Sequence, residues 1–555
     1  MGGERNKLDS IFYNFKNHSN FKNILNKQGF SDSFYNNIEN ILFIYLCEKN
    51  KSTKEKILRE ARMGIIEKQA TQNAIYSYLG TGLGFITVIW LSHSVTTDEN
   101  GLIRILVSTS ALLAQISSLG FSAVTIRLFP YFRNYEKGHH GFLFYAILVS
   151  LVGFLLCWLA FYFCKERIIE SNSEKSKLFV DYLFYLMPLS FFSLFFMVFD
   201  TYLRACYISV IGSFARDFLQ RIIILAVLAL YFFQYINFPL FVLGYIIATC
   251  FPSIILMLYI IKLKEWHIKP ARGFMSIELT KEIIKLSVFS FFSAFSGAII
   301  VNIDTIMVNQ MLGLSETGIY GIAFFFGSFM LIPARSINRI TSSIVSEYMK
   351  IKDFNAIKKL YNKTCNTGIT VGNILFIGIC ININNIMLLL PPEYASGKNV
   401  ILFIGGGYIA EMSTGINQVI LSNSKYYYYD GFFVIFMVVF TVLSNYFLIP
   451  IYGILGSAIA TAITVTSANI MRWGFLLYKY RMQPYDFNSV KLIFISIVTF
   501  LIGYFIPVNN NFLLDIAFRS LITGGIFTLL ILKTEAAPEI NVKIRKNLKR
   551  FSINL

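Results

Sequence analysis

The chain has 555 residues, of which 55% are hydrophobic and only 14% are charged. The charged fraction is about half that of an ordinary soluble protein. This composition excludes a soluble enzyme, a disordered chain and a secreted disulfide scaffold, and it indicates a membrane protein with many spans. The net charge of +18 is better explained by Lys and Arg in cytoplasmic loops than by a nucleic-acid partner. The seven cysteines are scattered and predict neither a disulfide nor a metal site.

Residues 1–72 are predicted to form a polar cytoplasmic tail, because they are rich in Lys and Asn and contain no uninterrupted apolar core. A transmembrane helix needs about 20 mostly apolar residues, and fourteen later segments meet this requirement. The weakest are the fifth, which carries Arg216, Asp217 and Arg221, and the ninth, which carries three asparagines. The fourteen predicted spans are 73–94, 101–125, 141–163, 178–203, 208–233, 238–261, 285–308, 317–338, 366–390, 399–421, 430–449, 453–475, 490–507 and 513–532.

The distribution of basic residues predicts the orientation of these spans. With the N-terminus in the cytoplasm, 41 of the 49 Lys and Arg fall in cytoplasmic loops, in the two tails or at the cytoplasmic ends of spans, and the opposite orientation reverses this ratio. Cytoplasmic loops collect Lys and Arg, so both termini are predicted to be cytoplasmic. The basic C-terminal tail, residues 533–555, is expected to lie on anionic lipid.

The sequence also contains an internal repeat. Leu243–Thr249 matches Leu455–Thr461 at five of seven positions with an offset of 212 residues, and the first and seventh spans begin with the same offset. Duplicated halves are frequent in transporters, so we predict an all-α protein with two lobes of six helices each. The predicted parts are an N-lobe (73–261), a cytoplasmic linker (262–284), a C-lobe (285–475) and two further helices (476–532).

Two segments resemble a known family. Asn302–Gly321 joins an aspartate-bearing span to the next span through Leu-Gly-Leu-Ser-Glu-Thr-Gly-Ile-Tyr-Gly, and Asn445–Thr461 ends in Tyr-Gly-Ile-Leu-Gly-Ser-Ala-Ile-Ala-Thr. Both resemble the bacterial polysaccharide (O-antigen type) flippases of the multidrug/oligosaccharidyl-lipid/polysaccharide (MOP) exporter superfamily. The resemblance covers residues 70–535 and implies two six-helix lobes around a central cavity, with two peripheral helices.

The resemblance also implies an activity. It would be alternating-access transfer of an undecaprenyl-diphosphate-linked oligosaccharide across the bacterial cytoplasmic (inner) membrane, without enzymatic catalysis. The implied partners are the lipid-linked glycan and membrane lipids, and other polysaccharide-assembly proteins are compatible with it. The polar N-terminal tail departs from the family pattern, since such flippases do not need one.

Charged residues inside spans are costly, and they are candidates for a functional site. Three Asp–Arg pairs are spaced i,i+4 with the acid first, which places both groups on one helix face in the favourable order. Each pair could simply neutralise itself. The pairs are Asp200/Arg204, Asp217/Arg221 and Asp515/Arg519.

Other arginines have no evident local partner. Arg104 lies within the second span, whereas Arg127, Arg335 and Arg339 lie at cytoplasmic ends of spans, where they could equally extend to lipid headgroups. A diphosphate that crosses an apolar core needs fixed cations to replace its lost hydration. The candidate substrate-binding residues are therefore Arg104, Arg127, Arg204, Arg221, Arg335 and Arg339.

Two carboxylates also lack an evident partner, Asp304 in the seventh span and Glu411 in the tenth. They could bind a coupling Na⁺ or H⁺, although loss of hydration could equally leave them protonated and without a role. Asp200 and Asp217 are further candidates for ion coupling. We expect no resident cofactor and no metal centre.

Other functions remain open at this stage. A cation-coupled multidrug exporter and a peptidoglycan-precursor flippase share the predicted architecture, but several embedded arginines favour an anionic substrate over a cationic drug. A membrane-embedded polysaccharide polymerase or glycosyltransferase is less favoured, because the longest loops lack a cluster of convergent carboxylates, Arg or His. The many dispersed charges disfavour a channel or a scaffold.

Overall fold

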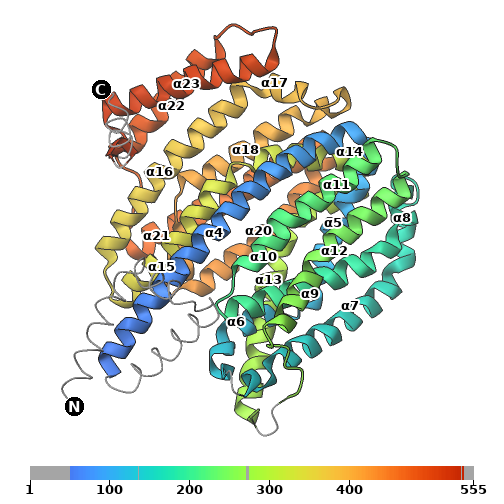
Figure 1. The fold of residues 1–555 in the computed structure, drawn as a ribbon. Helices are drawn as coiled ribbons and strands as arrows, with labels where there is room; N and C mark the ends of the chain where they lie inside the picture. Colours follow the sequence, from blue (N-terminus) through green and yellow to red (C-terminus); the bar gives the residue numbers. More distant parts are fainter. Residues whose placement is uncertain (1–50, 135–136, 271–273, 539, 543–555) are drawn as a thin grey trace, which may run out of the picture. The chain divides into compact units, whose positions relative to one another are not determined.

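The computed structural model describes residues 51–134, 137–270, 274–538 and 540–542, and the regular structure within these ranges is helical (Figure 1). The chain divides into two compact units, Met1–Ile75 and Tyr76–Leu555. The described part of the first unit is helical, and the rest of the predicted polar tail lies outside the described residues. All contacts discussed below lie within the second unit.

The helices follow one another with short connections. Those before the predicted linker are α4 (Lys51–Ser94), α5 (Thr97–Ser117), α6 (Phe121–Phe132), α7 (Phe142–Asn172), α8 (Lys177–Asp181), α9 (Leu186–Ala205), α10 (Val210–Ser213), α11 (Gln220–Phe232) and α12 (Phe238–Lys262). Those after it are α13 (Ile277–Leu312), α14 (Leu314–Ser328), α15 (Leu331–Lys350), α16 (Phe354–Ile381), α17 (Ile383–Leu388), α18 (Lys398–Ser413), α19 (Asn417–Ser422), α20 (Tyr427–Tyr452), α21 (Ile454–Tyr480), α22 (Phe487–Tyr504) and α23 (Phe512–Thr534). Short helical turns are η1 (Gly138–Gly141), η2 (Leu183–Tyr185), the π-helical η3 (Phe214–Leu219) and η4 (Pro392–Gly397).

Each of the fourteen predicted spans overlaps helical structure. Ten of the described helices are long and apolar enough to cross a membrane, and two bent pairs, α5 with α6 and α14 with α15, pass the same test together. The fifth span is broken into α10, η3 and α11, and the tenth is the short α18 followed by α19. The all-α, multi-span fold is therefore confirmed, whereas the exact lobe boundaries stay a prediction.

The two bends have local causes. Between α5 and α6 the chain turns by 46°, and Gly120 adopts a φ of 74°, which a residue with a Cβ rarely adopts. Between α14 and α15 it turns by 52°. Pro333 stands in the first turn of α15 and has no N–H to donate to the carbonyl of Phe329, so the two helices cannot continue as one.

Helices of the two predicted lobes meet where α5 packs against α13 and α14. Glycines permit this close approach: a Cβ on Gly101 would collide with the Leu314 carbonyl, and one on Gly318 with the Thr97 carbonyl. Close by, the hydroxyls of Thr97 and Ser315 lie 2.7 Å apart. The contact is therefore a backbone-to-backbone one, supported by polar side chains.

The two C-terminal helices explain the asparagines of the ninth span. α22 packs against α16, and α23 packs against α16 and α17. Asn382 donates to the Ser520 hydroxyl at 3.2 Å, and Asn385 donates to the Asp515 carboxylate at 2.6 Å. These polar groups are hydrogen-bonded to a neighbouring helix, which makes their burial tolerable.

Candidate functional site

Two of the predicted arginines come together. The Arg104 side chain on α5 packs on Gly321 of α14, where an added Cβ would lie 2.9 Å from Arg104 Cγ. The Arg221 guanidinium lies beside Gly84 of α4, where an added Cβ would lie 3.8 Å from Arg221 Cζ and 3.9 Å from Phe325 Cε2 of α14. The charges of Arg104 and Arg221 are close enough to repel one another.

Neither arginine is neutralised locally. Within the described residues, neither Arg104 nor Arg221 makes an ion pair with a carboxylate. Two like charges held near each other without a counter-ion are unfavourable, and an anion between them relieves the repulsion. We refer to Arg104 and Arg221 as the arginine pair.

The predicted ion pair between Asp217 and Arg221 is wrong for this structure. Asp217 Oδ2 instead accepts a hydrogen bond of 2.9 Å from the Ser77 hydroxyl on α4. The cause is the packing of η3 on α4, where a Cβ on Gly80 would collide with the Asp217 carbonyl. This contact places the aspartate next to Ser77, while Arg221 lies two turns further along α4, at Gly84.

Arg216 belongs to the same region, although sequence reasoning gave it no role. It lies on η3, is exposed, and its guanidinium carbon stands 5.0 Å from the centre of the Phe196 ring. The charges of Asp217 and Asp200 attract it. Its position inside an apolar span was the only signal in the sequence that could have identified it.

The predicted pair of Asp200 and Arg204 is present, with Nη2 and Oδ2 2.8 Å apart. Arg204 is half-exposed, and Asp200 packs closely on Gly212, the second residue before η3. Asp200 therefore neutralises Arg204 in this conformation. This pair lies near Arg216, whose charge acts on Asp200, and not at Arg104.

The remaining predicted arginines lie elsewhere. Arg127 is exposed on α6, and Arg335 and Arg339 are exposed on α15. Within the described part of the chain, none of the three forms an ion pair. They do not contribute to the arginine pair in this conformation.

Asp304 is the most enclosed of the predicted carboxylates, with 3% of its surface exposed. It accepts hydrogen bonds from three helices: Tyr320 Oη of α14 at 3.1 Å, Asn445 Nδ2 of α20 at 2.6 Å, and the Thr461 hydroxyl of α21. All three donors are neutral, and none of the described cations pairs with it. The buried Oδ1 of Asn445 has no hydrogen-bond partner in this part of the structure.

Glu411 was predicted to lack a partner, and among the described residues it forms no ion pair, although it lies near two arginines. The charges of Arg472 and Arg335 both act on it. Arg472 is itself buried and forms a 2.9 Å ion pair with Asp430. Glu411 thus belongs to a group of opposite charges, whereas Asp304 does not.

The pair of Asp515 and Arg519 forms as predicted, at 2.9 Å, and both residues are buried. Asp515 also accepts hydrogen bonds from Asn385 and from the Asn509 N–H. Arg519 donates to the carbonyl of Ile506 at 2.8 Å. This buried pair and its hydrogen bonds hold α23 against its neighbours, so we assign it to the fold and not to a site.

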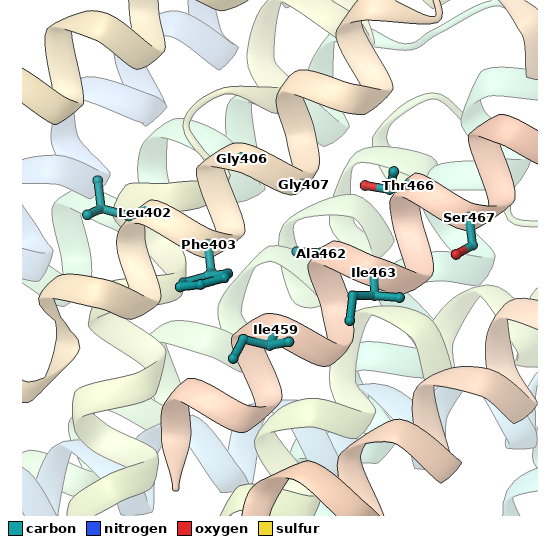
Figure 2. Close-up of a pocket in the computed structure, with 9 residues that line it drawn as sticks. All are labelled: Leu402, Phe403, Gly406, Gly407, Ile459, Ala462, Ile463, Thr466 and Ser467. Carbon is teal, nitrogen blue, oxygen red and sulfur yellow. The ribbon is translucent and has the colours of Figure 1, made fainter. Parts of the chain in front are cut away.

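A cavity of about 590 Å³ lies apart from these charges between α18 and α21 (Figure 2). Figure 2 shows its lining side chains, which come from both helices and are mostly apolar. None of the predicted site residues lines it. The lining residues are Leu402, Phe403, Gly406, Gly407, Ile459, Ala462, Ile463, Thr466 and Ser467.

Comparisons with known proteins identify the family. A family model described as "Polysaccharide biosynthesis protein" matches residues 68–345, which is half of the chain. The chain belongs to this family. A search of curated proteins finds no match.

Solved structures agree on the fold. A structure titled "Lipid II flippase MurJ, inward closed conformation" matches with a TM-score of 0.66 and 16% identity, over 86% of this chain and 99% of that one. An inward-facing multidrug resistance MATE family transporter of the MOP superfamily matches with a TM-score of 0.58 and 14% identity, over 73% of this chain and 94% of that one. An outward-facing MATE transporter of the same superfamily matches with a TM-score of 0.51 and 14% identity, over 75% of this chain and 95% of that one. The chain therefore shares the fold of these flippases and transporters.

Proposed function

We propose that this chain flips an undecaprenyl-diphosphate-linked oligosaccharide, a repeat unit of a surface polysaccharide such as O-antigen, across the bacterial cytoplasmic membrane by alternating access. The observation that carries the proposal is the arginine pair, in which two cations stand together without a carboxylate. A diphosphate supplies the missing negative charge, and guanidinium groups bind phosphate oxygens with directed hydrogen bonds. Membership of a polysaccharide biosynthesis family supports the glycan part of the substrate.

The contact between α5 and α14 fits one state of the transport cycle. In the orientation predicted from basic residues, Thr97, Gly101, Ser315 and Gly318 lie at the outer ends of their helices; we call these four residues the outer gate. The gate is closed in this conformation, because its backbones touch. The arginine pair then receives its substrate from the cytoplasmic side.

Asp304 is proposed as the residue that couples transport to Na⁺ or H⁺. Its carboxylate, the unpartnered Asn445 Oδ1 and the Thr461 hydroxyl are all oxygen groups, which hard cations prefer as ligands. The carboxylate has no cationic partner among the described residues, so a bound cation would neutralise it. The opposite charges around Glu411 make that residue the weaker candidate.

The test measures how much lipid-linked oligosaccharide accumulates on the cytoplasmic side of the membrane in cells that lack this gene. Wild-type protein should clear the accumulated glycolipid, whereas Arg104→Gln or Arg221→Gln should slow clearance by about 10-fold to 150-fold, the loss of one charged hydrogen-bonding partner. Arg167→Gln, an exposed arginine of α7, is the matched control and should behave as wild type. Full activity of both test variants would refute an arginine-lined path.

The likeness to MATE transporters and to a lipid II flippase defines the alternatives. If the chain is a multidrug exporter, deletion of its gene leaves the amount of glycolipid unchanged and lowers dye efflux. If the chain is a peptidoglycan-precursor flippase, cells that lack its gene accumulate lipid II instead of the polysaccharide precursor. Identification of the accumulated lipid by mass spectrometry separates these outcomes.

A further inference from the structure

The Asp217 carboxylate has two candidate partners, the hydroxyl of Ser77 and the guanidinium of Arg221. In this structure it is bonded to Ser77. Asp217 and Arg221 stand i,i+4 on one helix with the acid first, which is the order that favours an ion pair. The carboxylate nevertheless accepts the hydroxyl of Ser77 at 2.9 Å. Among the described residues Arg221 forms no ion pair with a carboxylate, and it lies near enough to Arg104 for their charges to repel.

The contact with Ser77 depends on how η3 packs on α4. A Cβ on Gly80 would lie 3.1 Å from the Asp217 Cβ and would collide with the Asp217 carbonyl. The absence of a side chain at Gly80 therefore lets the two backbones approach, and this brings Ser77, three residues earlier on α4, to the carboxylate. η3 is a π-helical turn within a longer helix, a feature that occurs frequently at functional sites.

We propose that Ser77 is a positioning residue for Arg221. By holding the Asp217 carboxylate, Ser77 keeps Arg221 available for the diphosphate; when this hydrogen bond breaks, Asp217 turns to Arg221 and competes with the diphosphate for the same guanidinium. The chain would thus carry its own means of releasing the substrate. This inference rests on the proposed function, because it assumes that the arginine pair binds a diphosphate.

Arg216 does not replace Ser77 as the partner that holds the Asp217 carboxylate. Its guanidinium stands over Phe196 and is attracted by both Asp200 and Asp217, so it offsets part of the charge of Asp217 without forming an ion pair with it. Asp200 is committed to Arg204 at 2.8 Å. Among these acids, Asp217 is therefore the one free of an ion pair and spaced to reach Arg221.

The test measures binding of geranylgeranyl diphosphate to the purified full-length protein in nanodiscs. Ser77→Ala should weaken binding about tenfold or more, because the released carboxylate neutralises Arg221. Adding Asp217→Asn to Ser77→Ala should restore most of the affinity, since an amide cannot neutralise the guanidinium. Ser77→Thr keeps the hydroxyl and should bind as wild type.

Thr81→Ala is the matched control, because Thr81 lies one turn along α4 and its hydroxyl bonds only to the Ser77 carbonyl, at 2.8 Å. Equal thermal unfolding of the variants excludes misfolding. Wild-type affinity in Ser77→Ala, or a double variant that binds no better than Ser77→Ala, would overturn the inference and leave the proposed function standing. If wild-type protein does not bind the diphosphate at all, the proposed function fails, and this inference fails with it.

Discussion

Substitution of Gly318 by Ala should open the outer gate. A Cβ at this position would lie 3.0 Å from the Gly101 nitrogen and would collide with the Thr97 carbonyl. Both neighbours are backbone atoms of α5, so they cannot move aside as a flexible side chain can. Overpacking of this kind costs about 1–3 kcal/mol.

This cost applies only while α5 and α14 touch. The open state has no such contact, so the ratio of open to closed protein should rise about 5-fold to 150-fold. Asn100 is a suitable reporter, because it is fully buried beside the gate and donates to Tyr394. A cysteine at this position should react with a membrane-impermeant maleimide only when the gate opens.

The assay measures the labelling rate of Asn100→Cys from outside the cell, in a Cys164→Ser background because Cys164 is exposed. Gly318→Ala should raise this labelling rate about 5-fold to 150-fold. Gly524→Ala is the control, since a Cβ there meets nothing within 4 Å, and it should leave the rate unchanged. An unchanged rate in correctly inserted Gly318→Ala protein would refute the assignment of this contact as a gate.

Three further predictions concern other charges. Asp304→Asn should abolish the dependence of transport on Na⁺ or on a proton gradient, measured in proteoliposomes with K⁺ replacing Na⁺; a retained dependence would exclude this residue from coupling. Arg519→Ala leaves Asp515 charged and buried, so the free energy of unfolding should fall by about 3–5 kcal/mol, measured as thermal unfolding in detergent. Burial opposes the ionised form of Asp486, but hydrogen bonds from the Ser489 N–H and neighbouring side chains hold its pKa below its usual value. The stabilisation is therefore present above the unfolded pKa near 4 and is lost as the pH falls through the lower folded pKa, so the stability difference between wild type and Asp486→Asn should shrink below about pH 4.

The positions of the helices could be predicted because burial in lipid demands long apolar segments, and the sequence displays these directly. The pairs Asp200/Arg204 and Asp515/Arg519 were also predictable, because their geometry is set within one helix. The bend before α15 follows from Pro333 in the same local way. Each of these features depends on residues that are near one another in the chain.

The partners of Asp217 and Asp304 could not be predicted, because they come from distant helices. Ser77 is 140 residues from Asp217, and Asn445 and Thr461 are 141 and 157 residues from Asp304. A single sequence gives no information on which faces of two such helices meet.

One helix, α14, connects all of these features within 15 residues. Ser315 and Gly318 form its side of the outer gate, Tyr320 donates to Asp304, Gly321 packs on Arg104, and Phe325 lies, like Arg221, next to Gly84 of α4. Since a helix moves nearly as a rigid rod, a shift that breaks the bond of Tyr320 to Asp304 also displaces the gate and the surroundings of both arginines. In the proposed transport cycle, ion binding, substrate contact and access would therefore change in a single displacement, with no separate relay between distant parts of the protein.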